Sequence, residues 1–307
     1  MLRVIFLAQR LVHGVGVLLG VSILVFGLTW LTGDPINVLV PRNTPPEEVA
    51  RLKHDLGLDR PLPIQYIDFL QRAVRGDFGQ SLRHRAPALP LVLDRLPATL
   101  ALLASALLVM LVVGLPLGML GATFHGQAPD VLARSVSLLG QSIAAPWLGL
   151  LLILVFAVQL RWLPSSGLDR PTGIALPALV AGAYPAAALA RLTRAGLLEV
   201  LAADYVRAAR GKGLTERLVL WRHALKNAAL PVVTFVGLQV AFLFSNSVVA
   251  EAIFAYPGMG RLAVDAIGAR DLPLIQAFVV LAAVVVVLVN LVVDVLYAWL
   301  DPRVRLA

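Results

Sequence analysis

Long, uninterrupted runs of apolar residues dominate this chain and limit the folds that it can adopt. A helix crosses the hydrocarbon layer of a membrane with about 20 apolar residues. Runs of that length occupy six stretches of the 307 residues, at about 11–31, 98–121, 136–160, 174–193, 231–250 and 273–299. Because lipid offers the backbone no hydrogen bonds, each run is expected to be helical. The sequence therefore predicts an all-α integral membrane protein with six transmembrane helices.

The composition excludes a water-soluble domain and gives no support to an enzyme. Hydrophobic residues make up 59% of the chain and charged residues 14%, against roughly 25% charged residues in an average soluble domain. Cysteine is absent, and the five histidines do not cluster at ligand spacing, so we expect no metal site. The Gly211-Lys212 pair lacks the rest of a phosphate-binding loop, so we expect no ATP binding in this chain. The chain also lacks a Gly-x-Ser-x-Gly motif, and we expect no catalytic residue.

The distribution of basic residues predicts the orientation of the chain. With the N-terminus placed in the cytoplasm, the inner segments carry 13 Lys and Arg residues and the two short outer loops carry four. Basic residues favour the cytoplasmic side in short loops. We therefore expect both termini on the cytoplasmic side of the membrane. The arginines lack interleaved aromatic residues, so no nucleic acid is expected as a partner.

The long outer loop 32–97 is predicted to be structured. Thr44 to Glu47 forms a capping box, and apolar residues then recur at helical spacing, which predicts a helix at about 45–56. A second helix is expected at about 63–75. The two helices could dock a partner, or they could form a cap that only shields the bundle.

Small residues and ion pairs are expected to hold the bundle together. Gly16 and Gly20 are one helical turn apart, as are Gly114 and Gly118, and this spacing favours close approach of helix backbones. Prolines inside the apolar runs, such as Pro146, predict kinks. We expect Asp294 to pair with an arginine of the inner loop, either Arg191 or Arg194.

The largest inner loop, 191–230, carries the most informative pattern. Helical patterning runs to about Arg210, breaks at Gly211 and Gly213, and resumes after Thr215, which predicts a knob of two short helices beyond the membrane. Its apolar side chains, Leu214, Leu218 and Trp221, together with rim charges, are typical of a partner site.

The knob resembles the coupling motif of ATP-binding-cassette importer permeases. Arg207-Ala208-Ala209 and Gly213 hold the spacing of that motif, and His223-Ala224-Leu225-Lys226 follows at its end, a form that is similar to the peptide/nickel branch. Further segments that resemble this branch are Gly33-Asp34-Pro35, Leu56–Asp59, Gln65-Tyr66, Gly76–Gly79, Leu96–Leu100, Pro257–Gly260, Arg270–Pro273 and Asp301-Pro302-Arg303. Two departures, at Pro146 and at Ser245-Asn246, lie near the expected path.

The resemblance implies a type I importer permease of the subunit type with a long outer loop after the first crossing. It implies a first helix within 1–31, an outer insert at 32–97 and a core permease domain at 98–307. The implied partners are a second, homologous permease subunit, two ATPase subunits that bind ATP and Mg, an extracytoplasmic substrate-binding protein and membrane lipid. The implied substrate is a di- or oligopeptide; nickel or a metal chelate is the alternative, and an ion-coupled secondary transporter is the alternative of another class.

Two sets of candidate site residues follow. By the resemblance, the ATPase-coupling residues are Asp204, Tyr205, Arg207, Ala208, Ala209, Lys212, Gly213, Leu214, Arg217, His223 and Leu225. Polar groups at membrane depth usually face a cavity or another helix, and this argument marks Gln141, Ser142, Gln239, Ser245, Asn246 and Glu251 as candidates for the translocation path. Hydrogen bonding between helices is the alternative role for these polar residues.

Overall fold

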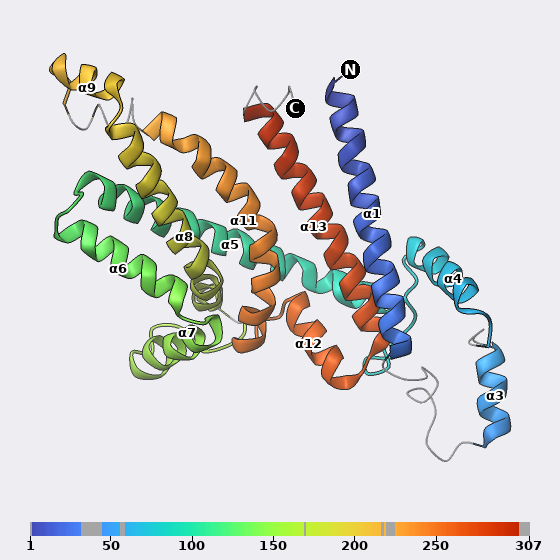
Figure 1. Cartoon of the computed structure of the whole chain (residues 1–307). Coiled ribbons are helices and arrows are strands. Elements are labelled where there is room, and N and C mark those ends of the chain that lie inside the picture. Colours follow the sequence, from blue (N-terminus) through green and yellow to red (C-terminus); the bar gives the residue numbers. More distant parts are fainter. Residues whose placement is uncertain are drawn as a thin grey trace. The chain divides into compact units, whose positions relative to one another are not determined.

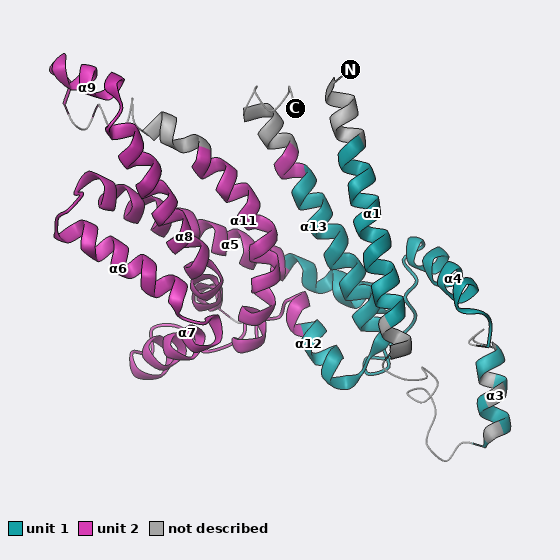
Figure 2. Ribbon diagram, in the orientation of Figure 1, with its two compact units in different colours: residues 1–97, 262–291, 301–307 teal, residues 98–261, 292–300 magenta. Residues whose placement is uncertain are grey.

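The computed structural model describes residues 2–31, 45–55, 59–168, 170–215, 218 and 225–300. The elements of this part of the chain are helices (Figure 1). They form two compact units (Figure 2), of which the first contains the described residues of 1–97 and 262–291 and the second those of 98–261 and 292–300.

The expected crossings are largely confirmed. The structure contains five helical segments that are long and apolar enough to span a membrane, and up to six if one bent pair of helices counts as a span. The five segments are Gln9–Gly27 of α1 (Leu2–Leu31), α5 (Ala88–Thr123), Pro171–Leu201, which joins the short η2 (Pro171–Ile174) to α8 (Ala175–Leu201), Pro231–Ile253 of α11 (Leu225–Ile253), and Leu272–Asp294 of α13 (Leu272–Leu300).

The third expected crossing, 136–160, bends at Pro146, where the sequence predicted a kink. The segment is divided between α6 (Ala128–Ser142) and α7 (Ala145–Leu152), which continues into the π-helical η1 (Ile153–Gln159). The chain bends by 109° between the two parts. Pro146 explains the break, because it has no N–H and its ring would clash with the carbonyl of Ser142 in a continuous helix. The chain is extended at Ile143 and Ala144 instead.

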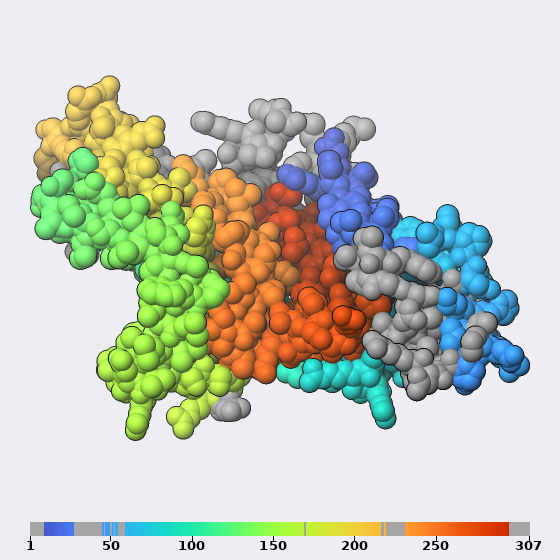
Figure 3. Space-filling view, turned by 60° about the horizontal axis from the view of Figure 1, so that its bottom comes forward, coloured from blue at the N-terminus to red at the C-terminus, as the bar shows by residue number. Residues whose placement is uncertain are grey.

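The second half of the bent pair carries a face of exposed apolar side chains. Trp147, Leu150, Leu154 and Val158 are each about half exposed, and α7 and η1, light green in Figure 3, lie at the surface. Such a face suits contact with lipid rather than with water.

The second unit is packed around α8. Helices α6, α7 and α11 lie on it, and α5 approaches it closely through its glycines. The glycine spacing on α5 has the packing role that was predicted for it. A Cβ at Gly114 would lie 2.7 Å from the carbonyl oxygen of Ala186, and one at Gly118 would lie 2.6 Å from that of Ala190. Only glycine allows the two backbones to approach so closely. Gly16 and Gly20 of α1, in contrast, meet no described atom within 4 Å.

The outer insert in the first unit contains the two predicted helices, α3 (Pro46–Asp55) and α4 (Leu62–Val74). The proposed capping residue, Thr44, lies outside the described residues. Aromatic side chains hold α4 against α1: the rings of Phe26 and Tyr66 are 5.5 Å apart and those of Phe26 and Phe69 are 6.0 Å apart. The Tyr66 hydroxyl also forms a 2.8 Å hydrogen bond with Ser22 Oγ. The insert is therefore a packed element rather than an unstructured loop.

The loop after α4 is attached to the turn between α12 (Met259–Ala269) and α13. Ser81 Oγ and the backbone N–H of Arg83 both donate to the buried carboxylate of Asp271, which directly precedes α13 and also accepts from the N–H of Leu274. Two of the segments that carry the family resemblance, Gly76–Gly79 and Arg270–Pro273, meet here, since Gly79 lies against Pro273.

Candidate functional site

The first part of the predicted knob is a short helix, α9 (Asp204–Gly211), that follows α8 after only two residues (Figure 1). Helix α8 itself runs eight residues beyond the predicted end of its apolar run, to Leu201. Asp204 lies in the first turn of α9 and Arg210 in the last, so both charges favour the helix dipole. The knob therefore begins directly at the end of a membrane-spanning helix.

The turn after α9 depends on Gly213. Its φ is +80°, and its N–H donates to the carbonyl oxygen of Arg210 over 2.9 Å. Residues with a side chain are strained in this left-handed region. The prediction that the chain turns at Gly213 through a backbone angle suited to glycine is confirmed. No described atom lies within 4 Å of the place that a Cβ would take, so the constraint comes from the backbone alone.

Helix α9 has one buried face and one exposed face. Val206 and Ala209 are buried and pack with Val200, Leu201 and Leu214. Ala209 and Leu214 therefore fasten the knob to the end of α8, and their part in coupling stays a prediction.

The other described coupling candidates lie on the exposed face of the knob. Arg207 forms an ion pair with Asp204 at the surface, and the Tyr205 side chain is 45% exposed. The exposed candidates are Asp204, Tyr205, Arg207, Ala208, Lys212 and Gly213. Arg217, His223 and Trp221 lie outside the described residues, as does most of the predicted second helix; Leu225 is the first residue of α11.

The polar candidates for the translocation path have different surroundings. Gln141 and Gln239 are partly buried, and the structure shows no hydrogen-bond partner among the described residues for Gln141 Nε2 or Gln239 Oε1. Ser142 and Ser245 are exposed. The half-buried Asn246 donates from Nδ2 to the carbonyl oxygen of Phe242, on its own helix, over 2.9 Å.

Glu251 differs most from its expected place on the path. Its side chain is fully buried in the second unit, and the Thr99 hydroxyl donates to Glu251 Oε1 over 2.8 Å. The N–H of Arg261 donates to Glu251 Oε2 over 3.1 Å, and Thr99 Oγ1 accepts from the N–H of Met259 over 2.9 Å. In this structure the carboxylate holds a loop in place, and it does not face open space.

Two segments of the family resemblance, Leu96–Leu100 and Pro257–Gly260, meet at Glu251 near the end of α11. A Cβ at Gly258 would lie 2.3 Å from Glu251 Cδ and Oε2, so glycine is required where the loop passes the carboxylate. Tyr256 closes the junction by donating from its hydroxyl to the carbonyl oxygen of Ala98 over 3.0 Å. Burial, together with the charge of Glu251, raises the pKa of Tyr256, which keeps its hydroxyl a donor.

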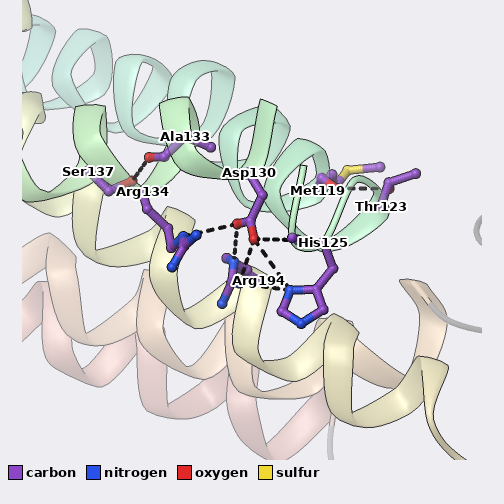
Figure 4. Close-up of polar contacts among 9 residues, drawn as sticks. Met119, Thr123, His125, Asp130, Ala133, Arg134, Ser137 and Arg194 are labelled. Carbon is purple, nitrogen blue, oxygen red and sulfur yellow. Dashed lines mark hydrogen bonds and ion pairs between the residues drawn. The ribbon is translucent and has the colours of Figure 1, made fainter. Parts of the chain in front are cut away.

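Another buried carboxylate, Asp130, lies where α5 turns into α6 (Figure 4). Arg194 of α8 donates to both of its oxygens, from Nε to Oδ1 over 2.7 Å and from Nη2 to Oδ2 over 3.0 Å. The N–H of Gly126 donates to Oδ2 as well, over 3.0 Å. Arg194, expected as a partner of Asp294, thus binds Asp130.

Comparison with known proteins decides the family. Residues 114–306 match the model of the binding-protein-dependent transport system inner membrane component, and residues 1–103 match the N-terminal part of such membrane components. The chain belongs to this family of transporter permeases.

Curated relatives of the permease are similar along its whole length. The glutathione transport system permease protein GsiC of Escherichia coli (strain K12) is 40% identical over 301 residues, which cover 98% of each chain. The protein of the same name from Shigella dysenteriae serotype 1 (strain Sd197) has the same identity and coverage.

Solved structures show that the permease has the fold of type I importer permeases. A chain of the MetNI methionine ABC transporter, in an inward-facing conformation, superimposes with a TM-score of 0.57 at 21% identity and covers 69% of the permease and 96% of itself. A chain of an amino acid ABC transporter with histidines gives a TM-score of 0.55 at 15% identity, with coverage of 69% and 94%.

Sequence reasoning did not find the partners of Glu251 and Asp130. Thr99 was inside a recognised segment and Tyr256 directly preceded another, but nothing in those segments says that they lie at Glu251. Asp130 was not singled out, although a lone acid next to the start of a predicted apolar helix is a signal that could have marked it.

Proposed function

We propose that this permease forms half of the translocation path of an ATP-driven importer, paired with a homologous but different permease subunit. Two ATPase subunits, which bind ATP and Mg, dock on the inner side, and an extracytoplasmic substrate-binding protein delivers the substrate on the outer side. The chain performs no covalent chemistry. Its membership of the permease family and its 40% identity to GsiC support this arrangement.

The division of α9 into two faces carries the proposal for coupling. Val206 and Ala209 fix the knob to the end of α8, while Tyr205, Ala208 and Lys212 form an exposed stripe at helical spacing beside this buried face. A helix anchored in this way moves together with α8. The exposed stripe is the surface that an ATPase subunit would bind and displace.

Two unpartnered amide atoms support a path beside α6 and α11. Gln141 Nε2 and Gln239 Oε1 are buried without a described hydrogen-bond partner, and a buried polar atom without a partner is costly. Water or substrate in a path would supply the missing bonds. We place Ser245 and Asn246 along the same path, with Ser142 at its margin, whereas Glu251 serves the path by holding the loop at the end of α11.

The substrate class that we propose is a di- or oligopeptide. The relatives from Escherichia coli and Shigella are named for glutathione, which is a small peptide. Nickel or a metal chelate is the second candidate, and it becomes a result of the substrate test. The excess of basic residues in the inner segments supports an orientation with both termini in the cytoplasm.

Purification of the tagged permease from its own membrane tests the proposed assembly. A second permease chain and ATPase chains should co-purify and be identified by mass spectrometry. A permease that is purified alone, yet transports after reconstitution without ATP, would contradict the proposal.

A further inference from the structure

We propose that the ion pair between Asp130 and Arg194 is a positioning element, which makes α6 and the α5–α6 turn follow the movement of α8. The inference rests on the proposed coupling role of the α9 knob. It assigns a task in that process to two residues that lie outside the knob and outside the path.

The geometry of the ion pair fixes the orientation of α6 relative to α8 as well as the distance between them. The guanidinium of Arg194 binds both oxygens of Asp130, and the carboxylate is completely buried (Figure 4). A bidentate pair of this kind resists rotation, whereas apolar contacts between helices allow sliding. Asp130 lies in the first turn of α6, so the pair connects the beginning of α6 to α8 at a defined angle.

Arg194 reaches three successive segments of the chain. The stem of its side chain passes over Gly121 in the last turns of α5, where an added Cβ would lie 3.0 Å from Arg194 Cδ. Its Nη2 lies 3.1 Å from His125 Nδ1, and His125 belongs to the turn that connects α5 to α6. The end of α5, the turn and the start of α6 are therefore gathered around one side chain of α8.

The pair lies close to the knob along the same helix. Arg194 precedes the end of α8, at Leu201, by two helical turns, and the next turn packs against α5 through Leu197 and Ala122. Val200 and Leu201, which end α8, hold the buried face of α9. A displacement of α9 thus moves the last turns of α8, and the ion pair passes this movement to α6 and to the bent pair that α6 begins.

Stability alone is a weak explanation for a buried ion pair. The cost of removing both charges from water offsets much of their attraction. Around Asp130, however, Arg134 Nε lies 3.3 Å from Oδ1 as a second and more exposed cation. Since Arg134 keeps a positive charge near the carboxylate when Arg194 is changed, the fork geometry of Arg194 can be tested separately from charge.

The test is the substitution Arg194→Lys in the complete complex. Lysine keeps the charge but cannot bind both oxygens in the fixed geometry of arginine. Arg191→Lys is the matched control, because Arg191 lies on the same helix and is exposed. In proteoliposomes, peptide uptake, ATP hydrolysis and thermal stability are measured on the same preparations.

We expect Arg194→Lys to assemble and to hydrolyse ATP at nearly the wild-type rate, while uptake per ATP falls by about tenfold, a size typical of a lost contact in a coupling network. Arg191→Lys should match the wild type. A proportional fall of uptake, hydrolysis and stability would show a merely structural role and overturn the proposal, as would unchanged uptake per ATP.

A second variant covers the case in which Arg194→Lys does not assemble. Asp130→Asn keeps the shape of the side chain and still accepts from Arg194, so it should assemble and show a smaller loss of uptake per ATP. If neither variant assembles, the pair serves folding alone and the proposal is wrong. Failure of the wild-type complex to show ATP-driven uptake would instead contradict the proposed function. ATP-driven uptake by the wild type is therefore measured before the variants are compared.

Discussion

Gly213 is the residue at which the coupling knob turns. A residue with a side chain in the left-handed region costs about 1–2 kcal/mol, and a β-branched residue is more strained there. We expect Gly213→Val to leave the permease inserted and paired but to uncouple hydrolysis from uptake or to release the ATPase, and Gly213→Ala to do the same more mildly. Subunit retention, hydrolysis and uptake are measured together in the reconstituted complex.

Gly211→Ala is the matched control for the turn. Gly211 is the last residue of α9, its φ is not positive, and a Cβ there would meet open space. Alanine is favoured over glycine in a helix, so this variant should retain uptake. Normal coupling in Gly213→Val would show that the knob at 204–226 is not the coupling site.

Thr99 supports a prediction about the buried junction. Thr99→Val would leave Glu251 Oε1 and the N–H of Met259 without the hydroxyl that serves both. An unsatisfied buried group costs about 1–3 kcal/mol, so the melting temperature of the purified permease should fall. Thr99→Ser keeps the hydroxyl and should melt near the wild type; equal melting of the valine and serine variants would refute the role of the junction.

Asn246 allows the path to be tested apart from packing. The hydrogen bond described for its side chain goes to a backbone carbonyl of its own helix, so Asn246→Leu removes no described hydrogen bond between helices. We expect altered uptake or substrate range with little change in assembly or detergent stability. Ser247→Ala is the control, because the Ser247 hydroxyl is buried and donates to the carbonyl oxygen of Phe244. Lost expression or lowered detergent stability of Asn246→Leu would instead assign Asn246 to packing.

Among the helices, hydropathy predicted the positions of most elements because it is a local property. The run at 273–299 matches α13 within one residue at each end, and both outer helices lie close to their predicted ranges. The size of the bend between α6 and α7, 109°, was missed because an apolar run records composition and not direction. Pro146 was the signal, but a proline predicts anything from a slight kink to a complete break.

Contacts between distant segments lay beyond sequence reasoning for a different reason. Thr99 and Glu251 are 152 positions apart, and Asp130 and Arg194 are 64 apart. Spacing carries information only within one helix or turn, so the family segments could be recognised without any sign that two of them meet at one carboxylate. The turn at Gly213 could be predicted because it is local.

The outer insert carries a prediction at the scale of elements. We propose that α3 and α4 contact the binding protein, since they form an ordered part of the outer loop. Deletion of 44–75 should leave assembly and basal hydrolysis intact but abolish stimulation by the binding protein. Tyr66→Phe, which removes only the hydrogen bond to Ser22 from the contact with α1, is the control. Full stimulation after the deletion would show that the insert is a cap.

The whole molecule is proposed to work as one half of an ATP-driven peptide importer. An ATP-driven importer differs most clearly from an ion-coupled transporter in its source of energy. The two classes can be separated only in the assembled complex, because this chain is proposed to bind no ATP.

The decisive measurement is uptake of a radiolabelled peptide, such as glutathione, by proteoliposomes that contain the purified complex with its binding protein. We predict uptake that requires ATP and the binding protein and that continues when a protonophore collapses the proton gradient. Nickel uptake under the same conditions would replace the proposed substrate class but leave the proposed ATP-driven mechanism unchanged. Uptake that needs no ATP and stops with the protonophore would contradict the central claim.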